Sequence, residues 1–491
     1  MVASRGGSQC FVVVSAFMVG IFALWADSTQ AMLSLARSVG LARGNSGSTC
    51  TSTAWRRCDR ILIRCASNWD DFMGKVEDLL PEESADIAHP GGVPGPAPVR
   101  SRIEQTESNQ IERIKPSPVE QKTIQGRRVF IKRDDLLRLP GSQISGNKAR
   151  KMYSLNQIPA DKFPSCVVSY GGPQSNAMLA LAAVVNYKNR ELTSGADEQS
   201  NSNSIRFVYY TKKLPRFLKK QASGNLFRAV ALGMEILELS PKNYHDLFGG
   251  EWGGNADPPV GLVPPNQSDF LWVPQGGACE MAVEGVNILA QEILSFWSKE
   301  GNNKPLSVVL PGGTCTTAVL VHHALSALTS ENEGDEDAHL DIQVVVVPCV
   351  GDAAYAQRQM MAFSAQIGAS ADDIPHILSP YPETFDRPEM EGNKNKYFPF
   401  GEPDEAILQV FNLLKEEYGL VLDLVYGAPT WTILIRHFDV PLSADLTFDP
   451  RNPIAGREIM VVDCGGLEGV NTQLLRYKYK GLVDIKDIQL P

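Results

Sequence analysis

One lysine sits where a backbone turn and a helix start would favour nucleophilic chemistry. Lys148 follows Gly146-Asn147, after a predicted turn over residues 141–146, and a helical spacing of apolar residues begins at Met152. The positive end of a helix dipole disfavours a protonated amine. Because only a neutral amine attacks an aldehyde, this position predicts imine formation at Lys148. Asn147 is a candidate helix cap.

A second segment, GGPQSN at residues 171–176, follows a predicted strand and precedes a predicted helix. Free backbone N–H groups at such a helix start can hold an anion, here a substrate carboxylate. Ser175 adds a hydroxyl at the same place. The alternative is that Ser175 and Asn176 only cap the helix.

A third segment, LPGGTCTT at residues 310–317, also follows a strand and opens a helix. Its two glycines permit close backbone approach, and threonine hydroxyls with helix N–H groups suit a phosphate. It lacks the Gly-Lys-Ser/Thr ending of a nucleotide P-loop, and the chain has no Gly-x-Gly-x-x-Gly fingerprint. The candidate phosphate ligands are Gly312, Gly313, Thr314, Cys315, Thr316 and Thr317.

These segments are embedded in an alternation of short apolar runs and helical patterns. Several runs are continuously apolar, which is typical of strands buried on both faces of a parallel sheet. The pattern predicts an α/β architecture. Strands are predicted at 129–132, 166–169, 206–211, 235–239, 270–273, 307–310, 343–347 and 458–462. Helices are predicted at 178–187, 281–298 and 318–328, and polar surface loops at 195–204, 241–267 and 329–337.

In combination, the motifs resemble the D-cysteine desulfhydrase / 1-aminocyclopropane-1-carboxylate deaminase family of pyridoxal-phosphate enzymes. The resemblance runs in order from about residue 116 to about residue 473. It implies a tryptophan synthase beta-like fold of type II, in which two open, twisted, mostly parallel sheets carry flanking helices and the cofactor lies between two domains. The matching segments are KRDDL (132–136), GNKARK (146–151), GPQSN (172–176), PQGGA (274–278), GLVLDLVY (419–426) and CGGL (464–467).

The resemblance also implies roles for individual residues. Lys148 would form the Schiff base with pyridoxal 5'-phosphate and later move protons. Ser175 would contact the substrate carboxylate and take part in catalysis, and Asn176 would bond the pyridoxal hydroxyl. The loop from Gly312 to Thr317 would bind the phosphate, and Tyr426 would act catalytically against cofactor and substrate.

Four positions depart from the family pattern. Gly427 replaces the glutamate of a deaminase near the pyridine nitrogen, and Cys464 replaces a threonine that would contact the cofactor. Phe400 stands for a tyrosine, and Ala177 follows Asn176 where the family often has a polar residue; both are predicted to border the substrate. The sequence therefore predicts that cofactor binding is retained and that substrate recognition is changed.

The altered positions favour one reaction. Loss of the glutamate leaves a weaker electron sink, which suits α,β-elimination, where an early leaving group quenches the carbanion. We therefore expect a carbon–sulfur lyase that converts D-cysteine to pyruvate, ammonia and hydrogen sulfide. The same-class alternative is a 1-aminocyclopropane-1-carboxylate deaminase. A catalytically silent protein that binds pyridoxal phosphate or an amino acid is the alternative of another class.

Composition limits the partners. The chain has 491 residues, 43% hydrophobic and 21% charged, which indicates more than one globular domain. A net charge of -10 disfavours nucleic acid as a partner. We expect a small amino-acid substrate, no stable membrane partner after processing and, from the family, a homodimer. The nine cysteines show no disulfide or zinc spacing.

The N-terminal 65 residues differ from the remainder, with seven arginines, no lysine and two aspartates. An apolar run at 11–26 predicts a signal peptide over 1–31, and an Arg- and Ser-rich stretch at 32–65 resembles a transit peptide. We expect plastid import by the secretory route, with a mitochondrial or secretory leader as the alternative. A Pro- and Gly-rich linker follows at 66–115. The large domain is then predicted over 116–150 and 270–491, and the small domain over 151–269.

A metal site is not expected. His322 and His323 lie within the helix after the phosphate loop, but the sequence offers no third ligand, so both are interpreted as structural.

Overall fold

The computed structural model describes residues 114–194, 204–220, 223–249, 257–262, 264, 270–330, 340–380, 398–438 and 452–484. The chain divides into two units, Met1–Leu80 and Pro81–Pro491, and all described residues belong to the second. The predicted signal peptide and transit segment, and the linker up to residue 113, lie outside the described residues. None of the described helices has the length and apolar character needed to span a membrane.

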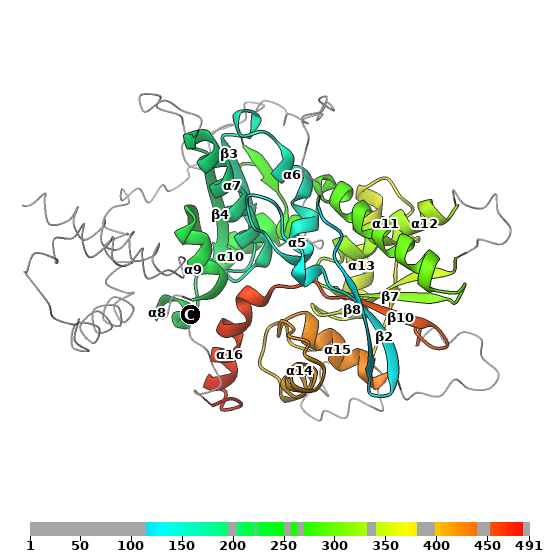
Figure 1. Ribbon diagram of the computed structural model, residues 1–491. Coiled ribbons are helices and arrows are strands. Elements are labelled where there is room, and N and C mark those ends of the chain that lie inside the picture. The colour runs from blue at the N-terminus through cyan, green and yellow to red at the C-terminus, as the bar shows by residue number, and fades with distance from the viewer. Residues whose placement is uncertain are drawn as a thin grey trace, which may run out of the picture. The chain divides into compact units, whose positions relative to one another are not determined.

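Six strands form the larger sheet, in the order β1-β2-β10-β7-β8-β9 (Figure 1). β1 pairs antiparallel with β2, and the other pairs are parallel. Val308 and Val309 are both fully buried but pack into different apolar clusters, one on each face. Continuous apolar runs are required for such a sheet. The strands are β1 (Val119–Ile124), β2 (Arg127–Lys132), β7 (Leu306–Gly312), β8 (Ile342–Pro348), β9 (His376–Ile377) and β10 (Glu458–Val462).

Four parallel strands form the smaller sheet, in the order β5-β4-β3-β6. Val167 and Val168 again enter separate apolar clusters on its two faces. β6 pairs with β3, so the strand predicted at 270–273 lies in the smaller sheet. The predicted boundary between the two domains, before residue 270, assigned this strand to the large domain instead. The strands are β3 (Cys166–Tyr170), β4 (Arg206–Lys212), β5 (Met234–Leu239) and β6 (Leu271–Val273).

Helices connect the strands, and the three predicted ones are present. Two of them, α7 and α12, are longer than predicted, and α11 begins two residues later than predicted. The predicted loop at 241–267 is partly wrong, because a helix begins at Pro241. Ser240 caps that helix by accepting a 3.1 Å hydrogen bond from the Asn243 N–H, and proline suits a first helical position. The helices are α5 (Gly146–Lys151), α6 (Tyr153–Gln157), α7 (Asn176–Ser194), α8 (Arg216–Lys220), α9 (Gly224–Ala231), α10 (Pro241–Phe248), α11 (Val283–Glu300), α12 (Thr316–Ser330), α13 (Ala353–Gln366), α14 (Glu405–Tyr418), α15 (Gly427–Arg436) and α16 (Val470–Tyr479).

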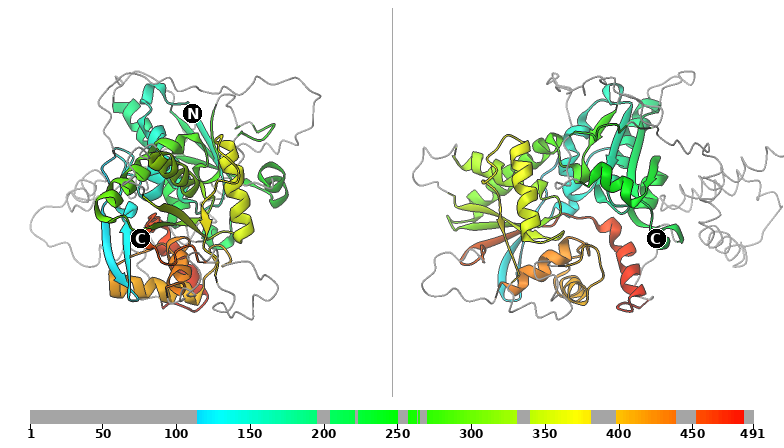
Figure 2. Two further views of the ribbon diagram at one scale, coloured as in Figure 1. Left: turned by 90° about the vertical axis from the view of Figure 1, so that its right-hand side faces the viewer. Right: turned by 180° about the vertical axis from the view of Figure 1, so that it is seen from behind.

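Short helix α5 occupies the place where the two sheets approach. It contacts α7 beside the smaller sheet and α11 beside the larger one. Figure 1 and the right-hand view of Figure 2 show this segment between the helices of the two layers. The predicted α/β class with two mostly parallel sheets and flanking helices is confirmed, and its central helix carries Lys148.

Candidate active site

The end of β10 holds the beginning of α5. The Asn147 N–H donates a 3.0 Å hydrogen bond to the Cys464 carbonyl. Gly146 has φ +65°, and a Cβ there would lie 2.3 Å from that same carbonyl oxygen. Only glycine accepts both the left-handed backbone and this approach. The chain therefore fixes the Lys148 backbone against the turn that contains Cys464.

Asn147 does not cap α5, contrary to the prediction. The cap position belongs to Ser145, whose side chain makes no capping hydrogen bond and donates instead to Glu468 at 2.7 Å. The Asn147 side chain accepts a 2.8 Å hydrogen bond from the Thr317 hydroxyl. This contact joins α5 directly to the loop of residues 312–317, called the threonine loop below, although Asn147 and Thr317 are 170 residues apart.

Burial favours the neutral form of the Lys148 amine. The side chain is half-buried, and desolvation lowers its pKa, while Cys464 and Asp423 act in the opposite direction. Burial therefore acts in the same direction as the helix dipole predicted from the sequence, and it lowers the pKa of Lys148 more directly. A neutral amine can act as a nucleophile or accept a proton.

A second lysine, which the sequence analysis missed, lies one turn further along α5. Lys151 is buried, and its Nζ donates a 3.0 Å hydrogen bond to the Gly276 carbonyl. Burial and the neighbouring Lys148 hold its pKa well below the usual value. The spacing of three residues places both amines on one helix face, and it is the signal that could have identified Lys151.

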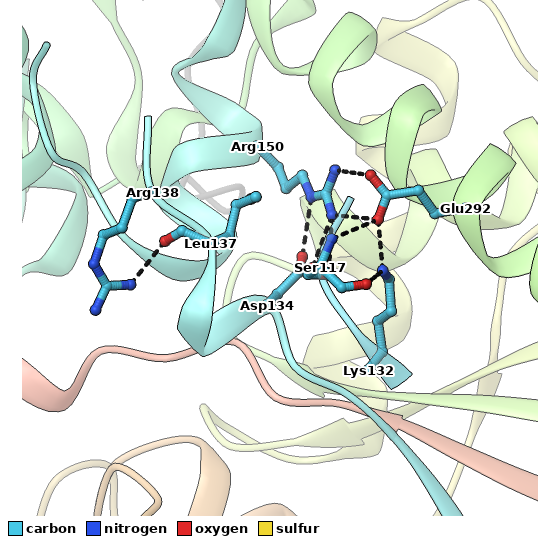
Figure 3. A network of polar contacts seen from close by, with 7 residues as sticks. All are labelled: Ser117, Lys132, Asp134, Leu137, Arg138, Arg150 and Glu292. Carbon is cyan, nitrogen blue, oxygen red and sulfur yellow. Dashed lines mark hydrogen bonds and ion pairs between the residues drawn. The ribbon is translucent and has the colours of Figure 1, made fainter. Parts of the chain in front are cut away.

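The opposite side of α5 is anchored by Arg150 in a buried polar network (Figure 3). Its guanidinium contacts Asp134 at 2.9 Å and Glu292 at 2.7 Å, and Lys132 also contacts Glu292 at 2.5 Å. Burial alone would lower the pKa of Arg150, but the two carboxylates raise it. Two cations and two anions balance in charge, so the network holds the helix without a buried unpaired ion.

The GGPQSN turn starts α7 at Asn176, as predicted. The Ser175 hydroxyl accepts a 3.3 Å hydrogen bond from the Met178 N–H, so it caps the helix. The same hydroxyl is hydrogen-bonded to Tyr209, a residue missed in the sequence, and Tyr209 also donates to the Gly172 carbonyl at 3.1 Å. Burial raises the pKa of Tyr209 well above its usual value, so the phenol stays protonated.

Asn176 is oriented by a residue from α9. Asn225 Nδ2 donates to Asn176 Oδ1 at 2.6 Å and to the Gln174 carbonyl at 3.1 Å, while the Gln174 side chain accepts from the Asn225 N–H at 2.9 Å. Because its oxygen is occupied, Asn176 keeps its amide N–H groups as donors. They approach Gly466, where a Cβ would lie 2.6 Å from Asn176 Nδ2.

The threonine loop lies at the predicted strand-to-helix turn, between the end of β7 at Gly312 and the start of α12 at Thr316. The hydroxyls of Thr314 and Thr316 are 2.8 Å apart. Cys315 has φ +55°, and its thiol is buried in the apolar cluster on one face of the larger sheet. Burial raises the pKa of that thiol to about 12, so Cys315 can contribute its backbone N–H but no thiolate.

Two further turns border this loop. A Cβ on Gly276 would lie 3.0 Å from the Thr314 methyl group, and a Cβ on Gly313 would lie 3.0 Å from the Tyr426 ring. Glycine at both positions keeps the loop open. The Lys151 amine reaches the Gly276 carbonyl beside the same loop, so two hydroxyls and an amine converge around a helix start.

Tyr426 is positioned by Asp423. One oxygen of Asp423 accepts from the Val425 and Tyr426 N–H groups at 2.8 and 2.7 Å, and the other accepts from the Gly427 N–H at 2.8 Å. Burial raises the pKa of Asp423 to about 6 despite these bonds. Burial also raises the pKa of Tyr426. The Tyr426 phenol therefore remains a proton donor at neutral pH.

The remaining predicted residues differ in exposure. The Phe400 ring is 5.7 Å from that of Tyr426 and 50% exposed, so it lies at an accessible edge. Ala177 is buried as the second residue of α7. Cys464 is half-buried, and burial together with Asp134 and Asp463 raises its pKa well above the usual value. Its thiol is therefore neutral.

Comparisons with known proteins place these features in context. No family model matches the chain. A Thermotoga maritima protein that carries the name of a 1-aminocyclopropane-1-carboxylate deaminase is 33% identical over 138 residues, which cover 27% of this chain and only 37% of that protein. The mitochondrial bifunctional D-cysteine desulfhydrase/1-aminocyclopropane-1-carboxylate deaminase of Arabidopsis thaliana is 24% identical over 348 residues, 70% of this chain and 74% of that protein.

The crystal structure of a homologue of the same deaminase matches with a TM-score of 0.46 and 18% identity, over 73% of this chain and 90% of that one. The named relatives are those that the sequence motifs had indicated. The resemblance of this chain to the D-cysteine desulfhydrase / 1-aminocyclopropane-1-carboxylate deaminase family is thus confirmed.

Proposed function

We propose that this chain is a pyridoxal-phosphate-dependent carbon–sulfur lyase that acts on D-cysteine. The observation that carries the proposal is the convergence of two distant segments on Asn147, the residue before Lys148. Asn147 bonds both the Cys464 carbonyl and the Thr317 hydroxyl. The amine beside it has a lowered pKa. The relatives named as a desulfhydrase and a deaminase support the same reading.

The residues present fit the phosphate of the cofactor. Thr314 and Thr316 offer hydroxyls 2.8 Å apart at the start of the 15-residue helix α12, where free N–H groups favour an anion. Lys151 adds an amine whose pKa is lowered by burial and by Lys148. A bound dianion would offset both effects and favour a charged Lys151, so the donor set suits phosphate better than a neutral group.

The residues present also fit the remainder of the cofactor. Lys148 would hold its aldehyde carbon, and Asn176 would donate to its ring hydroxyl, since the Asn176 oxygen is already engaged by Asn225. Cys464 would face the ring nitrogen as a neutral thiol, because its pKa is raised. When bound, the cofactor supplies an electron sink for the carbanion formed at the substrate Cα.

The protein groups would then divide the proton transfers. Lys148 Nζ, neutral in its half-buried position, would accept the Cα proton of D-cysteine. The Cβ–S bond breaks with its electron pair leaving on sulfur, and protonated Tyr426 would donate a proton to that sulfide. Ser175 and the N–H groups at the start of α7 hold the carboxylate. Water hydrolyses the released enamine to pyruvate and ammonia.

The alternative reaction is ring opening of 1-aminocyclopropane-1-carboxylate, which the names of both relatives include. Gly427 provides no carboxylate for it. The carboxylate next to Gly427 belongs to Asp423, whose oxygens are engaged with three backbone N–H groups. This arrangement favours elimination over ring opening. A silent binding protein is the remaining alternative, because Phe400 and Ala177 offer no polar contact to a substrate.

Import and assembly are proposed on separate grounds. The arginine-rich N-terminus supports import into an organelle, and the Arabidopsis relative is named as mitochondrial. We retain the plastid, reached after signal-peptide removal, as the proposed destination. We also propose a homodimer. Import of a fluorescent fusion and the solution mass of the purified chain test these two points.

Product analysis of the purified protein distinguishes the three functions. With added pyridoxal phosphate, D-cysteine should yield sulfide and pyruvate in equal amounts, and L-cysteine much less. Predominant 2-oxobutyrate from 1-aminocyclopropane-1-carboxylate would instead identify a deaminase. A bound cofactor without turnover of either substrate would leave the silent binding protein. Ser175→Ala serves as the matched variant and should raise the KM for D-cysteine about tenfold or more.

A further inference from the structure

Two adjacent histidines on α12 face one aspartate from the segment between α13 and β9. His322 Nε2 lies 2.7 Å from Asp373 Oδ1, and His323 Nδ1 lies 3.4 Å from Asp373 Oδ2. The three possible ligand atoms all lie within 4.8 Å of one another. Asp373 is the third ligand that the sequence did not reveal, because it is 50 residues further along the chain.

The second nitrogen of His323 is engaged by a buried hydroxyl. His323 Nε2 lies 3.1 Å from Ser364 Oγ on α13, and Ser364 is fully buried. A hydrogen bond at one ring nitrogen fixes the ring orientation and the tautomer, which is the usual support for a histidine that binds a metal. If Nε2–H donates to Ser364, the lone pair of Nδ1 points toward Asp373. In that tautomer, a cation between Nδ1 and Asp373 would satisfy both the lone pair and the carboxylate.

The three side chains are accessible to an ion. Both histidine side chains are 19% exposed and the Asp373 side chain 52%, so an ion can enter from solvent. Imidazole nitrogens and a carboxylate oxygen are donor types that divalent transition metals accept.

We infer that His322, His323 and Asp373 form a zinc site, with Nε2, Nδ1 and a carboxylate oxygen as ligands and water in the fourth position. Two imidazoles and one carboxylate, with a position left open, are a common donor set for Zn²⁺. The ion would replace the direct contacts to Asp373. Nothing in the proposed lyase reaction uses these residues, so the site is independent of that proposal.

The site would act on stability and not on the lyase reaction. Along α12, His323 lies about 9 Å from Thr317, at a rise of about 1.5 Å per residue. A metal ion there would tie the helix that begins at the threonine loop to the segment after α13, and it would not reach the reacting atoms. Its expected effect is on stability, since an ion that binds only the folded state raises the unfolding temperature.

Calorimetric titration of the chelator-treated holoenzyme with zinc chloride tests the site. We expect one Zn²⁺ per chain, and an affinity about tenfold or more weaker in His322→Ala and in Asp373→Asn. Asp373 is exposed, so its isosteric variant should fold normally. His245→Ala, at an exposed histidine on α10, is the matched control and should bind as the wild type does.

Cobalt absorption distinguishes this site from the cysteines. Co²⁺ bound by nitrogen and oxygen gives weak visible bands, whereas cysteine ligation adds an intense charge-transfer band. We expect the weak bands alone, and we expect Asp373→Asn to lose them. Absence of Zn²⁺ binding, a cysteine-type cobalt spectrum, or equal affinity in all variants would overturn the assignment and leave an ordinary histidine–aspartate ion pair.

Discussion

The Thr317 hydroxyl donates a 2.8 Å hydrogen bond to Asn147 Oδ1, which lies next to the candidate nucleophile Lys148. Thr317 belongs to α12, whose start forms the threonine loop, and Asn147 belongs to α5. The distance between the amine and the anion site is thus fixed by a direct contact between their two segments. A cofactor that carries both an aldehyde and a phosphate requires such a fixed distance.

Thr317→Val should weaken binding of pyridoxal phosphate about fivefold. The substitution removes a hydrogen bond worth about 1 kcal/mol while keeping the volume of the side chain. Thr317→Ser keeps the hydroxyl and should bind nearly as the wild type does. Fluorescence titration with the cofactor measures the affinities. A loss in Thr317→Ser with none in Thr317→Val would mean that the methyl group, and not the hydrogen bond, matters.

Gly146→Ala should destabilise the protein by about 3 kcal/mol. A Cβ would lie 2.3 Å from the Cys464 carbonyl, and φ is +65°. Left-handed backbone costs about 1–2 kcal/mol for alanine, and overpacking adds about 1–3 kcal/mol. Gly126 has φ +76° with open space around it, so Gly126→Ala isolates the backbone cost. Urea unfolding that gives equal losses for the two variants would contradict the close approach of β10 and α5.

Gly427→Glu should not create a deaminase. A Cβ at this position would lie 3.1 Å from Asp423 Oδ2, so the new side chain would start beside an existing carboxylate. A second carboxylate close to the first disfavours ionisation of both groups. We expect sulfide release from D-cysteine to fall about tenfold or more, with no 2-oxobutyrate from the cyclopropane substrate. Gly427→Gln, which has the same shape without the charge, should lose less. A gain of deaminase activity in the Glu variant would refute this explanation.

Asp463→Asn should flatten the dependence of stability on pH. Burial and Asp135 raise the pKa of Asp463 to about 7, against about 3.9 in an unfolded chain. Between these values the folded state binds more protons than the unfolded state, so stability is highest at low pH and is lost as pH rises toward 7. Urea unfolding measures the free energy of unfolding at pH 5 and at pH 8. Between these two pH values the wild type should lose on the order of 2 kcal/mol more stability than the variant.

An exposed carboxyl provides the control for that comparison. Asp161→Asn, on the surface, should leave the pH dependence of the wild type unchanged. If Asp463→Asn and the wild type lose the same stability between pH 5 and pH 8, Asp463 is not the group responsible.

The larger part of the fold was predictable because most of its strands contain continuous apolar runs. All eight predicted strands are present, and the central strands β3 and β7 pack on two faces, which demands such runs. β1 was missed because four of the six residues in its sequence, VEQKTI, are polar, and β9 has only two residues. The capping residue Ser240 and Pro241 at the first helical position could have identified α10.

The residues that support the site were harder to find. Asn225 orients Asn176 from 49 residues away, and Tyr209 bonds Ser175 from the neighbouring strand. Neither contact leaves a local pattern in the sequence, because each depends on how strands and helices are brought together. Lys151 is the exception, because its spacing of three residues from Lys148 is enough to predict that both amines lie on one face of the helix.

The visible absorbance of bound pyridoxal phosphate, measured in the wild type and in Lys148→Ala, tests whether Lys148 is the cofactor lysine. We expect the wild type to bind the cofactor with this band and to release sulfide from D-cysteine. Lys148→Ala should lack both, while Lys480→Ala, at an exposed lysine after α16, should retain both. An unchanged band and unchanged sulfide release in Lys148→Ala, or no cofactor bound to the wild type, would contradict the assignment of Lys148.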